Sequence, residues 1–263
     1  MLSQEHSTTG CEITGLVNSI ESFGSVDGPG VRFILFMQGC AMRCRYCHNP
    51  ETWSSCPEGV MKLTPRQALD MALRYKSYWK GGGGITVSGG EAMLQIDFVT
   101  ELFRLCKEEG VNTALDTSGN PFTYEEPYFT KFKALCDVTD LFILDIKHID
   151  DDAHKALTGC TNTNILEMAR YLSDNGKHMW IRHVLVPGLT DDEDALYRLG
   201  DFIKTLGSVD RVEVLPYHSL GIAKWDRLGL EYTLRDTRTP SKEQMDIANR
   251  LLHTADYKGY KGE

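Results

Sequence analysis

The sequence predicts an α/β fold built on a parallel sheet, either doubly wound or arranged as an open, partial barrel. Apolar, β-rich segments alternate with helical patterns along most of the 263 residues, as repeated βα units require. The apolar segments are nearly continuous runs of Val, Ile, Leu and Phe, which is typical of strands covered on both faces. Six units are two fewer than a complete eight-stranded barrel contains, so a barrel of this sequence would be open.

Six strands and six helices are expected, and Leu16–Phe23 adds a candidate edge strand. An acidic first turn suits the helix that starts at Asp192, and Ser241 is a candidate N-cap for the last helix. No linker or repeat divides the chain, so we expect one domain over residues 1–263, with an N-terminal extension (about 1–13) and a C-terminal helix and tail (about 241–263). The predicted strands are Val31–Met37, Ile85–Val87, Val111–Leu115, Leu141–Ile146, Met179–Val186 and Val212–Leu215. The predicted helices are Pro65–Trp79, Phe98–Glu109, Phe129–Cys136, Asn164–Asp174, Asp192–Leu206 and Ser241–Thr254.

Composition and charge argue against several classes of function. The net charge is −9, from 28 basic and 37 acidic residues, which disfavours partners such as nucleic acid or an anionic membrane surface. The segment Met1–Ser7 has neither a basic nor an apolar region, so we expect no signal peptide. No apolar run approaches the ~18 residues of a membrane span. We therefore expect a cytoplasmic protein whose thiols are reduced or bind metal.

Polar residues and glycines follow each predicted strand or lie at its end. Ligands of parallel sheets and barrels bind at the carboxyl ends of the strands, so these residues predict one site at one rim. The segments, in chain order, are Gln38–Cys40, Ser88–Glu91, Asp116–Gly119, Asp145–His148, Arg182 with Val186–Gly188, and Pro216–His218.

Three of the eight cysteines form a C-x3-C-x2-C-H motif after the first strand. Structural thiols are one interpretation, but the surrounding loop is polar and rich in Gly and Arg. Covalent haem fits Cys44–His48, yet it needs an exported protein and leaves Cys40 unused. A structural zinc site needs four closed ligands, and His48 directly follows Cys47. The eight cysteines are Cys11, Cys40, Cys44, Cys47, Cys56, Cys106, Cys136 and Cys160.

An iron–sulfur cluster is the fourth interpretation, and it usually takes four thiolates. Only three are supplied locally, because Cys56 follows nine residues after Cys47 without a tight motif. Three thiolates on a four-iron cluster leave one iron open to a non-protein ligand, as in a catalytic zinc site. A non-catalytic iron–sulfur electron-transfer protein and a zinc-binding adaptor remain as alternatives from another functional class.

The cysteine motif after the first strand and the Gly-Gly-Glu after the second resemble the radical S-adenosylmethionine (SAM) superfamily. Within it, six ordered blocks resemble the activating enzymes of glycyl radical enzymes, of the pyruvate formate-lyase type. Only Cys56 lies between the cysteine motif and Gly89, which favours this type over activases of other glycyl radical enzymes with a ferredoxin-like insert. The six blocks are Ser22–Asn49, Gly82–Gln95, Leu115–Gly119, Leu144–His148, Trp180–Gly188 and Val214–Gly221.

The resemblance implies a partial (β/α)6 barrel in which Cys40, Cys44 and Cys47 hold a [4Fe–4S] cluster. SAM would chelate the fourth iron and be cleaved reductively to methionine and a 5′-deoxyadenosyl radical. That radical would take a hydrogen atom from a glycine of pyruvate formate-lyase under anaerobic conditions. A flavodoxin or ferredoxin would supply the electron, and we expect the protein to be a monomer.

The resemblance also implies a set of SAM contacts, and the residue types suit them. Glycines let the backbone approach a ligand closely, and Glu91 can accept a charge-assisted bond from the SAM ammonium. Asp145 and Lys147 share one face of a strand. Arg182 needs an anionic partner within its apolar strand, either the SAM carboxylate or an internal acid. The implied SAM contacts are Tyr46, Cys47, His48, Gly89, Gly90, Glu91, Asp145, Ile146, Lys147, Arg182 and His218.

Two further sites follow from the resemblance. Asp116, Thr117 and Asp145 offer the oxygen ligands of a monovalent cation near SAM. Asp27, in the turn Asp27–Gly30 before the first strand, is expected on the side of the incoming substrate loop. A tight turn rich in Gly and Pro would explain the same four residues without any function.

Overall fold

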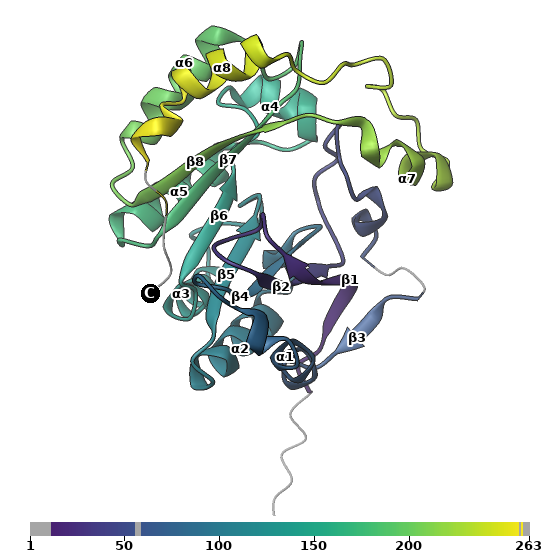
Figure 1. Ribbon diagram of the computed structural model, residues 1–263, viewed down its shortest axis with the longest axis vertical. Helices are drawn as coiled ribbons and strands as arrows, with labels where there is room; N and C mark the ends of the chain where they lie inside the picture. Colours follow the sequence, from purple (N-terminus) through teal and green to yellow (C-terminus); the bar gives the residue numbers. More distant parts are fainter. Residues whose placement is uncertain (1–11, 56–58, 258, 260–263) are drawn as a thin grey trace, which may run out of the picture.

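The computed structural model describes residues 12–55, 59–257 and 259. Within them, eight strands form one sheet in the order β3-β1-β2-β4-β5-β6-β7-β8 (Figure 1). From β2 to β8 all neighbours are parallel, whereas β1 is antiparallel to both β2 and β3. The strands are β1 (Gly15–Gly24), β2 (Arg32–Met37), β3 (Met61–Leu63), β4 (Gly84–Gly89), β5 (Asn112–Thr117), β6 (Leu141–Asp145), β7 (Met179–Leu185) and β8 (Val209–Pro216).

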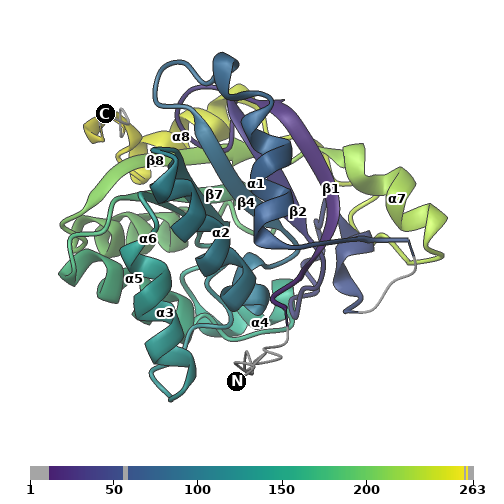
Figure 2. The ribbon, with the colours of Figure 1, turned by 90° about the horizontal axis from the view of Figure 1, so that it is seen from below.

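Helices connect the parallel strands and lie on the outer side of the curved sheet (Figure 2). Six parallel strands with crossover helices, in a sheet that is open between β3 and β8, confirm the predicted partial barrel. The strand expected at Leu16–Phe23 forms as β1, but its edge position was wrong, because β3 pairs along its other side and occupies the edge. The helices are α1 (Pro65–Leu73), α2 (Ile96–Glu108), α3 (Tyr128–Asp137), α4 (Asp151–Thr158), α5 (Thr163–Asp174), α6 (Glu193–Lys204), α7 (Ile222–Arg227) and α8 (Lys242–Leu251).

Side-chain caps fix where several helices begin. The predicted N-cap Ser241 forms a capping box with Gln244 at the start of α8, which satisfies two otherwise unpaired backbone donors. Thr64 caps α1 in the same way. At α6, the Asp192 carboxylate accepts a hydrogen bond from the Ala195 amide. These local signals are visible in the sequence, so the starts of these helices could be predicted.

The end of α1 differs from the prediction. The helix was expected to reach Trp79 but ends at Leu73, and a short 3-10 turn follows at Lys76–Tyr78. The Tyr75 ring lies 5.6 Å from the Phe33 ring, centroid to centroid. Packing of this ring on the core and the glycine run before β4 therefore override the helical pattern. Helices α4 and α7 and strand β3 were not predicted.

The barrel interior is polar near the carboxyl ends of the strands, as the strand register shows. Side chains of alternate residues face the interior, and in register these include Ser88, Asp116 and Asp145 near the carboxyl ends. The largest apolar core, by contrast, is formed where the helices cover the sheet. Ligand-binding groups can therefore gather inside the barrel without interrupting that core.

Arg32 organises the opposite, amino-terminal end of the barrel and is fully buried. Its guanidinium donates to Thr86 Oγ1 at 2.6 Å and to the carbonyl oxygens of Gly82 (3.0 Å) and Ile85 (2.8 Å). Thr86 Oγ1 in turn donates to the Asp27 carbonyl oxygen at 2.6 Å. These bonds hold the loop between β1 and β2 against the barrel interior. None of the described helices is long and apolar enough to cross a membrane.

Candidate functional site

A cavity of about 290 Å³ lies at the carboxyl ends of the parallel strands. Residues that follow β2, β4, β5, β6 and β8 line it, as the strand-end pattern predicts. The predicted residues on its wall are Cys40, Cys44, Tyr46, Cys47, His48, Gly89, Gly90, Asp116, Thr117, Asp145, Lys147 and His218. Four predicted residues, Asp27, Glu91, Ile146 and Arg182, do not line it.

The cysteine loop, residues 39–49, leaves β2 and places three cysteines on the cavity wall. The backbone amides of Arg43 and Arg45 donate to the carbonyl oxygens of Thr158 (2.7 Å) and Leu157 (3.0 Å). The last turn of α4 thereby satisfies its free carbonyl groups and fixes the loop. Cys44 is buried, and the other two thiols are half-buried. Cys11 and Cys56 lie outside the described residues.

The electrostatics of the cysteine loop suit a metal-bound thiolate. Burial raises the pKa of the Cys40 and Cys44 thiols to about 12 and also raises the pKa of Cys47. Buried thiolates at these positions therefore need a compensating cation. No three His, Cys, Asp or Glu side chains in the described ranges surround a single point as one bound ion would require. The thiolates of a four-iron cluster, by contrast, would each bind a separate iron.

Gly89 and Gly90 bring the end of β4 onto the start of the cysteine loop. Gly90 N donates to the Met37 carbonyl oxygen at 2.9 Å. Gly89 has φ +117°, and a Cβ there would lie 2.1 Å from Met37 N. At Gly90 a Cβ would lie 2.3 Å from the Gly39 carbonyl oxygen. Both glycines are therefore needed for the contact between two strand ends, a reason independent of any ligand.

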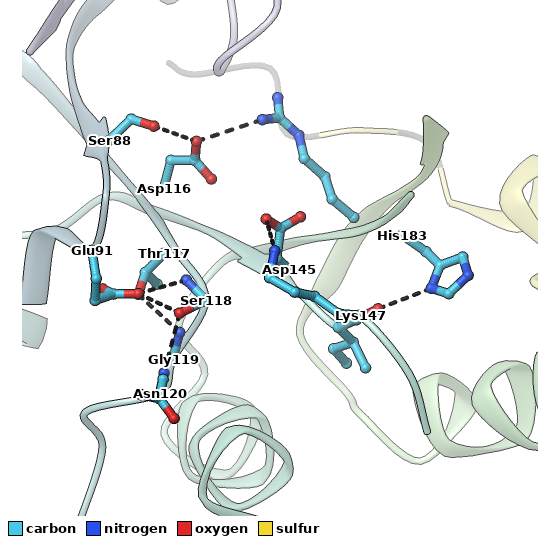
Figure 3. A network of polar contacts seen from close by, with 12 residues as sticks. Ser88, Glu91, Asp116, Thr117, Ser118, Gly119, Asn120, Asp145, Lys147 and His183 are labelled. Atoms are coloured by element: carbon cyan, nitrogen blue, oxygen red, sulfur yellow. Dashed lines mark hydrogen bonds and ion pairs between the residues drawn. The ribbon is translucent and has the colours of Figure 1, made fainter. Parts of the chain in front are cut away.

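The Glu91 carboxylate joins β4 to the loop after β5 (Figure 3). Glu91 is buried, and its two oxygens accept hydrogen bonds from Met93 N (3.0 Å), Thr117 Oγ1 (2.5 Å), Ser118 N (2.9 Å) and Ser118 Oγ (2.5 Å). Both oxygens thus already have protein partners. The predicted bond from Glu91 to the SAM ammonium stays a prediction.

Lys147 and Asp145 form a buried ion pair on the cavity wall, with Nζ and Oδ2 2.9 Å apart. Burial lowers the pKa of Lys147, but the Asp145 carboxylate together with Tyr46 and Cys44 outweighs burial and raises that pKa, so the ammonium is charged. Lys147 Nζ also lies 5.8 Å from the centroid of the Tyr46 ring. The pair is well placed to bind a zwitterionic ligand in the cavity.

The Tyr46 hydroxyl is buried on the same wall and, within the described part of the chain, has no hydrogen-bond partner. Buried hydroxyl groups are nearly always paired, so this group indicates a polar ligand in the cavity. Across the wall, the rings of His48 and His218 meet edge to face at 4.2 Å. Three of the predicted SAM contacts, Tyr46, His48 and His218, therefore line one cavity.

Arg182 contacts internal acids, the second of the two alternatives that its sequence left open. Its Nη1 lies 3.0 Å from Asp27 Oδ1 and its Nε 2.9 Å from Glu213 Oε2. Asp27, expected on the substrate side, is thus an ion-pair partner inside the barrel. Whether either residue also contacts SAM or substrate stays a prediction. The Ile146 side chain lies in the apolar core, and its backbone amide pairs with the Arg182 carbonyl oxygen at 3.0 Å.

The three candidate cation ligands all lie on the cavity wall, but each has a protein partner. Asp116 Oδ2 accepts from Ser88 Oγ at 2.6 Å (Figure 3). Thr117 Oγ1 donates to Glu91, and Asp145 pairs with Lys147. Burial raises the pKa of Asp116 to about 7, Arg182 opposes the rise, and the nearby acids Asp145 and Asp27 add to it.

Several wall residues were not predicted. Asn49, Thr52 and Trp53 follow the cysteine motif, and Val184 and Leu215 lie on the last two strands. Strand alternation could have identified Val184 and Leu215, because each lies two residues beyond another interior position. No spacing in the sequence identifies Trp53.

The open six-unit barrel and its three-cysteine loop define a radical SAM protein, and the model of the Radical SAM superfamily matches residues 34–200. The chain is 53% identical over 250 residues to the pyruvate formate-lyase-activating enzyme of Streptococcus mutans, with 95% of each chain covered. It is 47% identical to the enzyme of that name from Listeria monocytogenes, over 94% of this chain and 99% of the relative. The chain belongs to the family of pyruvate formate-lyase-activating enzymes.

The fold has relatives among solved structures. A radical SAM methyltransferase from Sphaerobacter thermophilus superposes with a TM-score of 0.60 at 16% identity, covering 86% of this chain and 64% of that one. This similarity concerns the fold alone. The predicted fold class and the predicted family are both confirmed.

Proposed function

We propose that this protein activates a pyruvate formate-lyase by generating a glycyl radical on it, with a [4Fe–4S] cluster and SAM as cofactors. The observation that carries the proposal is that three cysteines share one cavity with Tyr46 and Lys147, whose polar groups can bind a ligand there. The family supports the substrate, because the relatives are named for the activation of pyruvate formate-lyase.

Cys40, Cys44 and Cys47 hold three irons of the cluster and leave the fourth for the amino and carboxylate groups of SAM. When bound and reduced, the cluster and SAM supply a 5′-deoxyadenosyl radical that takes a hydrogen atom from the substrate glycine. The hard chemistry thus belongs to the cofactors, and the protein provides orientation and exclusion of water. A flavodoxin or ferredoxin serves as reductant, and the protein acts in the cytoplasm as a monomer.

The protein side chains orient SAM by charge and hydrogen bonding. The Lys147 ammonium attracts the SAM carboxylate, while Asp145 accepts from the ribose hydroxyl groups. The Tyr46 hydroxyl donates to SAM and thereby gains the partner it otherwise lacks. His48 and His218 contact the adenine ring from the edge of the cavity.

Anaerobic reconstitution tests this function. The protein is loaded with iron and sulfide, reduced with dithionite and mixed with SAM, and 5′-deoxyadenosine is measured. Pyruvate formate-lyase is then added, and its glycyl radical is detected as an EPR doublet. Zinc as the sole bound metal, or no cleavage of SAM, would contradict the enzyme proposal. A doublet with a different glycyl radical enzyme only would change the substrate and leave the chemistry intact.

A further inference from the structure

Residues of the C-terminal segment 217–234 also hold the cysteine loop in place. Trp225 of α7 donates its indole N–H to the Cys47 carbonyl oxygen at 2.8 Å. The neighbouring Lys224 Nζ donates to Asn49 Oδ1 at 2.6 Å and to Glu51 Oε1 at 2.5 Å. The cysteine loop is therefore fixed by side chains more than 170 positions away in the sequence.

Aromatic packing makes this contact a small core of its own. The Trp225 ring is buried and meets the Trp53 ring edge to face, with centroids 5.0 Å apart and planes at 87°. Trp53 in turn forms a hydrogen bond to the Cys47 sulfur, and both side chains pack against the same apolar cluster. The apolar residues that share this core are Val186, Tyr217, Trp225, Tyr232 and Leu234, with Tyr46, Cys47 and Trp53 packed against them.

The close approach leaves little freedom for the cysteine loop. A Cβ at Gly221 would lie 3.1 Å from His48 Cδ2 and 3.2 Å from the Cys47 carbonyl oxygen. Helix α7 has six residues, and a helix this short is not stable without tertiary packing. The loop and α7 therefore stabilise each other, and any coupling free energy between them has the same size in both directions.

We propose that Trp225 and Lys224 are positioning residues for the cluster, and that docking of α7 is coupled to cluster binding. Trp225 fixes the carbonyl group of Cys47 and holds Trp53 against the Cys47 sulfur. Lys224 fixes the turn that follows, so that Cys47 and His48 both face the cavity. This inference rests on the proposed function, because it takes the three cysteines as cluster ligands.

The substitution Trp225→Phe tests the positioning, since it keeps a ring in the core and removes the N–H donor. Trp79→Phe is the matched control, because the buried indole nitrogen of Trp79 has no hydrogen-bond partner among the described residues. Each reconstituted protein is mixed with an iron chelator, and the rate of iron release is measured. Loss of one hydrogen bond corresponds to a release about fivefold faster for Trp225→Phe, with no change for Trp79→Phe.

Hydrogen–deuterium exchange tests the coupling directly. In the wild-type protein, loading of the cluster should slow exchange of the amides at the end of α7, such as Leu228 and Leu230, which bond within the helix and its last turn. In Trp225→Phe the same loading should leave these amides nearly unchanged. The EPR spectrum of the reduced cluster should also respond less to SAM in this variant, because His48 is held less firmly.

Equal rates of iron release from Trp225→Phe and Trp79→Phe would overturn the proposal. So would amide exchange in α7 of the wild-type protein that is the same with and without the cluster. If circular dichroism shows that Trp225→Phe does not fold, Lys224→Gln replaces it, and rescue of slow iron release by Lys224→Arg is then expected. Unchanged release in Lys224→Gln would equally overturn it. A wild-type protein that binds no cluster would refute the proposed function instead, and that result is obtained before any variant is compared.

Discussion

Arg182 on β7 and Asp27 in the loop between β1 and β2 form an ion pair inside the barrel, with Nη1 and Oδ1 3.0 Å apart. Their side chains are 7% and 17% exposed. Glu213 on β8 accepts from the same guanidinium. One cation thus connects the N-terminal loop to the last strand of the sheet and keeps that loop in the interior.

Replacing Arg182 with Met should lower the free energy of unfolding by about 3–5 kcal/mol, because Asp27 is left as a buried charge without its partner. Urea denaturation monitored by circular dichroism measures the loss. Arg211→Met is the control, since Arg211 pairs with the same Glu213 but is 47% exposed, and its loss should be about 1 kcal/mol or less. Equal losses in the two variants would contradict the structural role of the pair.

Asp116 should make the stability pH-dependent in a defined direction. Its pKa is about 7 in the folded protein, above the ~3.9 of an unfolded chain. Between these values the folded state retains a proton that the unfolded state has lost. The contribution of this group to the free energy of unfolding is therefore fully present below about pH 4. It decreases as the pH rises to about 7, by up to ~1.4 kcal/mol per pH unit.

Asp116→Asn should remove this pH dependence. From about pH 5 to pH 7, urea denaturation should therefore show the free energy of unfolding of the variant rising relative to that of the wild type. The charged groups facing Asp116 are Arg182, Asp145 and Asp27, and they are unchanged in the variant. Asp97→Asn, at an exposed position on α2, is the control and should keep the wild-type slope. Parallel curves for Asp116→Asn and the wild type would refute the assignment.

Glu91→Gln should lower the free energy of unfolding by about 2–3 kcal/mol, because the carboxylate accepts four hydrogen bonds and charge-assisted bonds are strong. In the variant, an NH2 group would replace one of the two carboxylate oxygens and would face hydrogen-bond donors instead of acceptors. Thermal unfolding measures the effect, with the partly exposed Glu101→Gln on α2 as a control that should change little. A loss no larger than that of the control would show that the network is dispensable.

Substitution of Cys40, Cys44 or Cys47 by Ala should abolish the cluster, since each removes one of only three local thiolates. Cys106→Ala and Cys136→Ala should retain it, because these thiols are buried in the core under α2 and α3. Iron and sulfide content after anaerobic reconstitution, together with EPR of the reduced protein, distinguishes the two groups. An active Cys44→Ala variant would rule out the proposed ligand set.

The six parallel strands could be predicted because continuous apolar runs specify burial on both faces. The cavity wall could be predicted as well, since the carboxyl ends of parallel strands meet at one rim. Helix α7 could not, because its six residues are too few for a periodic pattern and its stability comes from packing on the cysteine loop.

Interaction partners that come from distant segments could not be predicted from the sequence either. The pattern required an anion for Arg182 but could not choose one, because Asp27 and Glu213 are 155 and 31 positions away. The same holds for Trp225 and Cys47, 178 positions apart. Local rules specify which groups need a partner, whereas the fold decides which group provides it.

Strand β8 pairs on one side only in the described sheet. In the part of the chain that the structure describes, the sheet begins at β3 and ends at β8 without joining, which leaves the barrel wall incomplete along one side. Backbone hydrogen bonds between strands therefore do not hold the two ends of this sheet together, and side-chain contacts such as the ion pairs of Arg182 with Asp27 and Glu213 connect the N-terminal loop to the last strand instead.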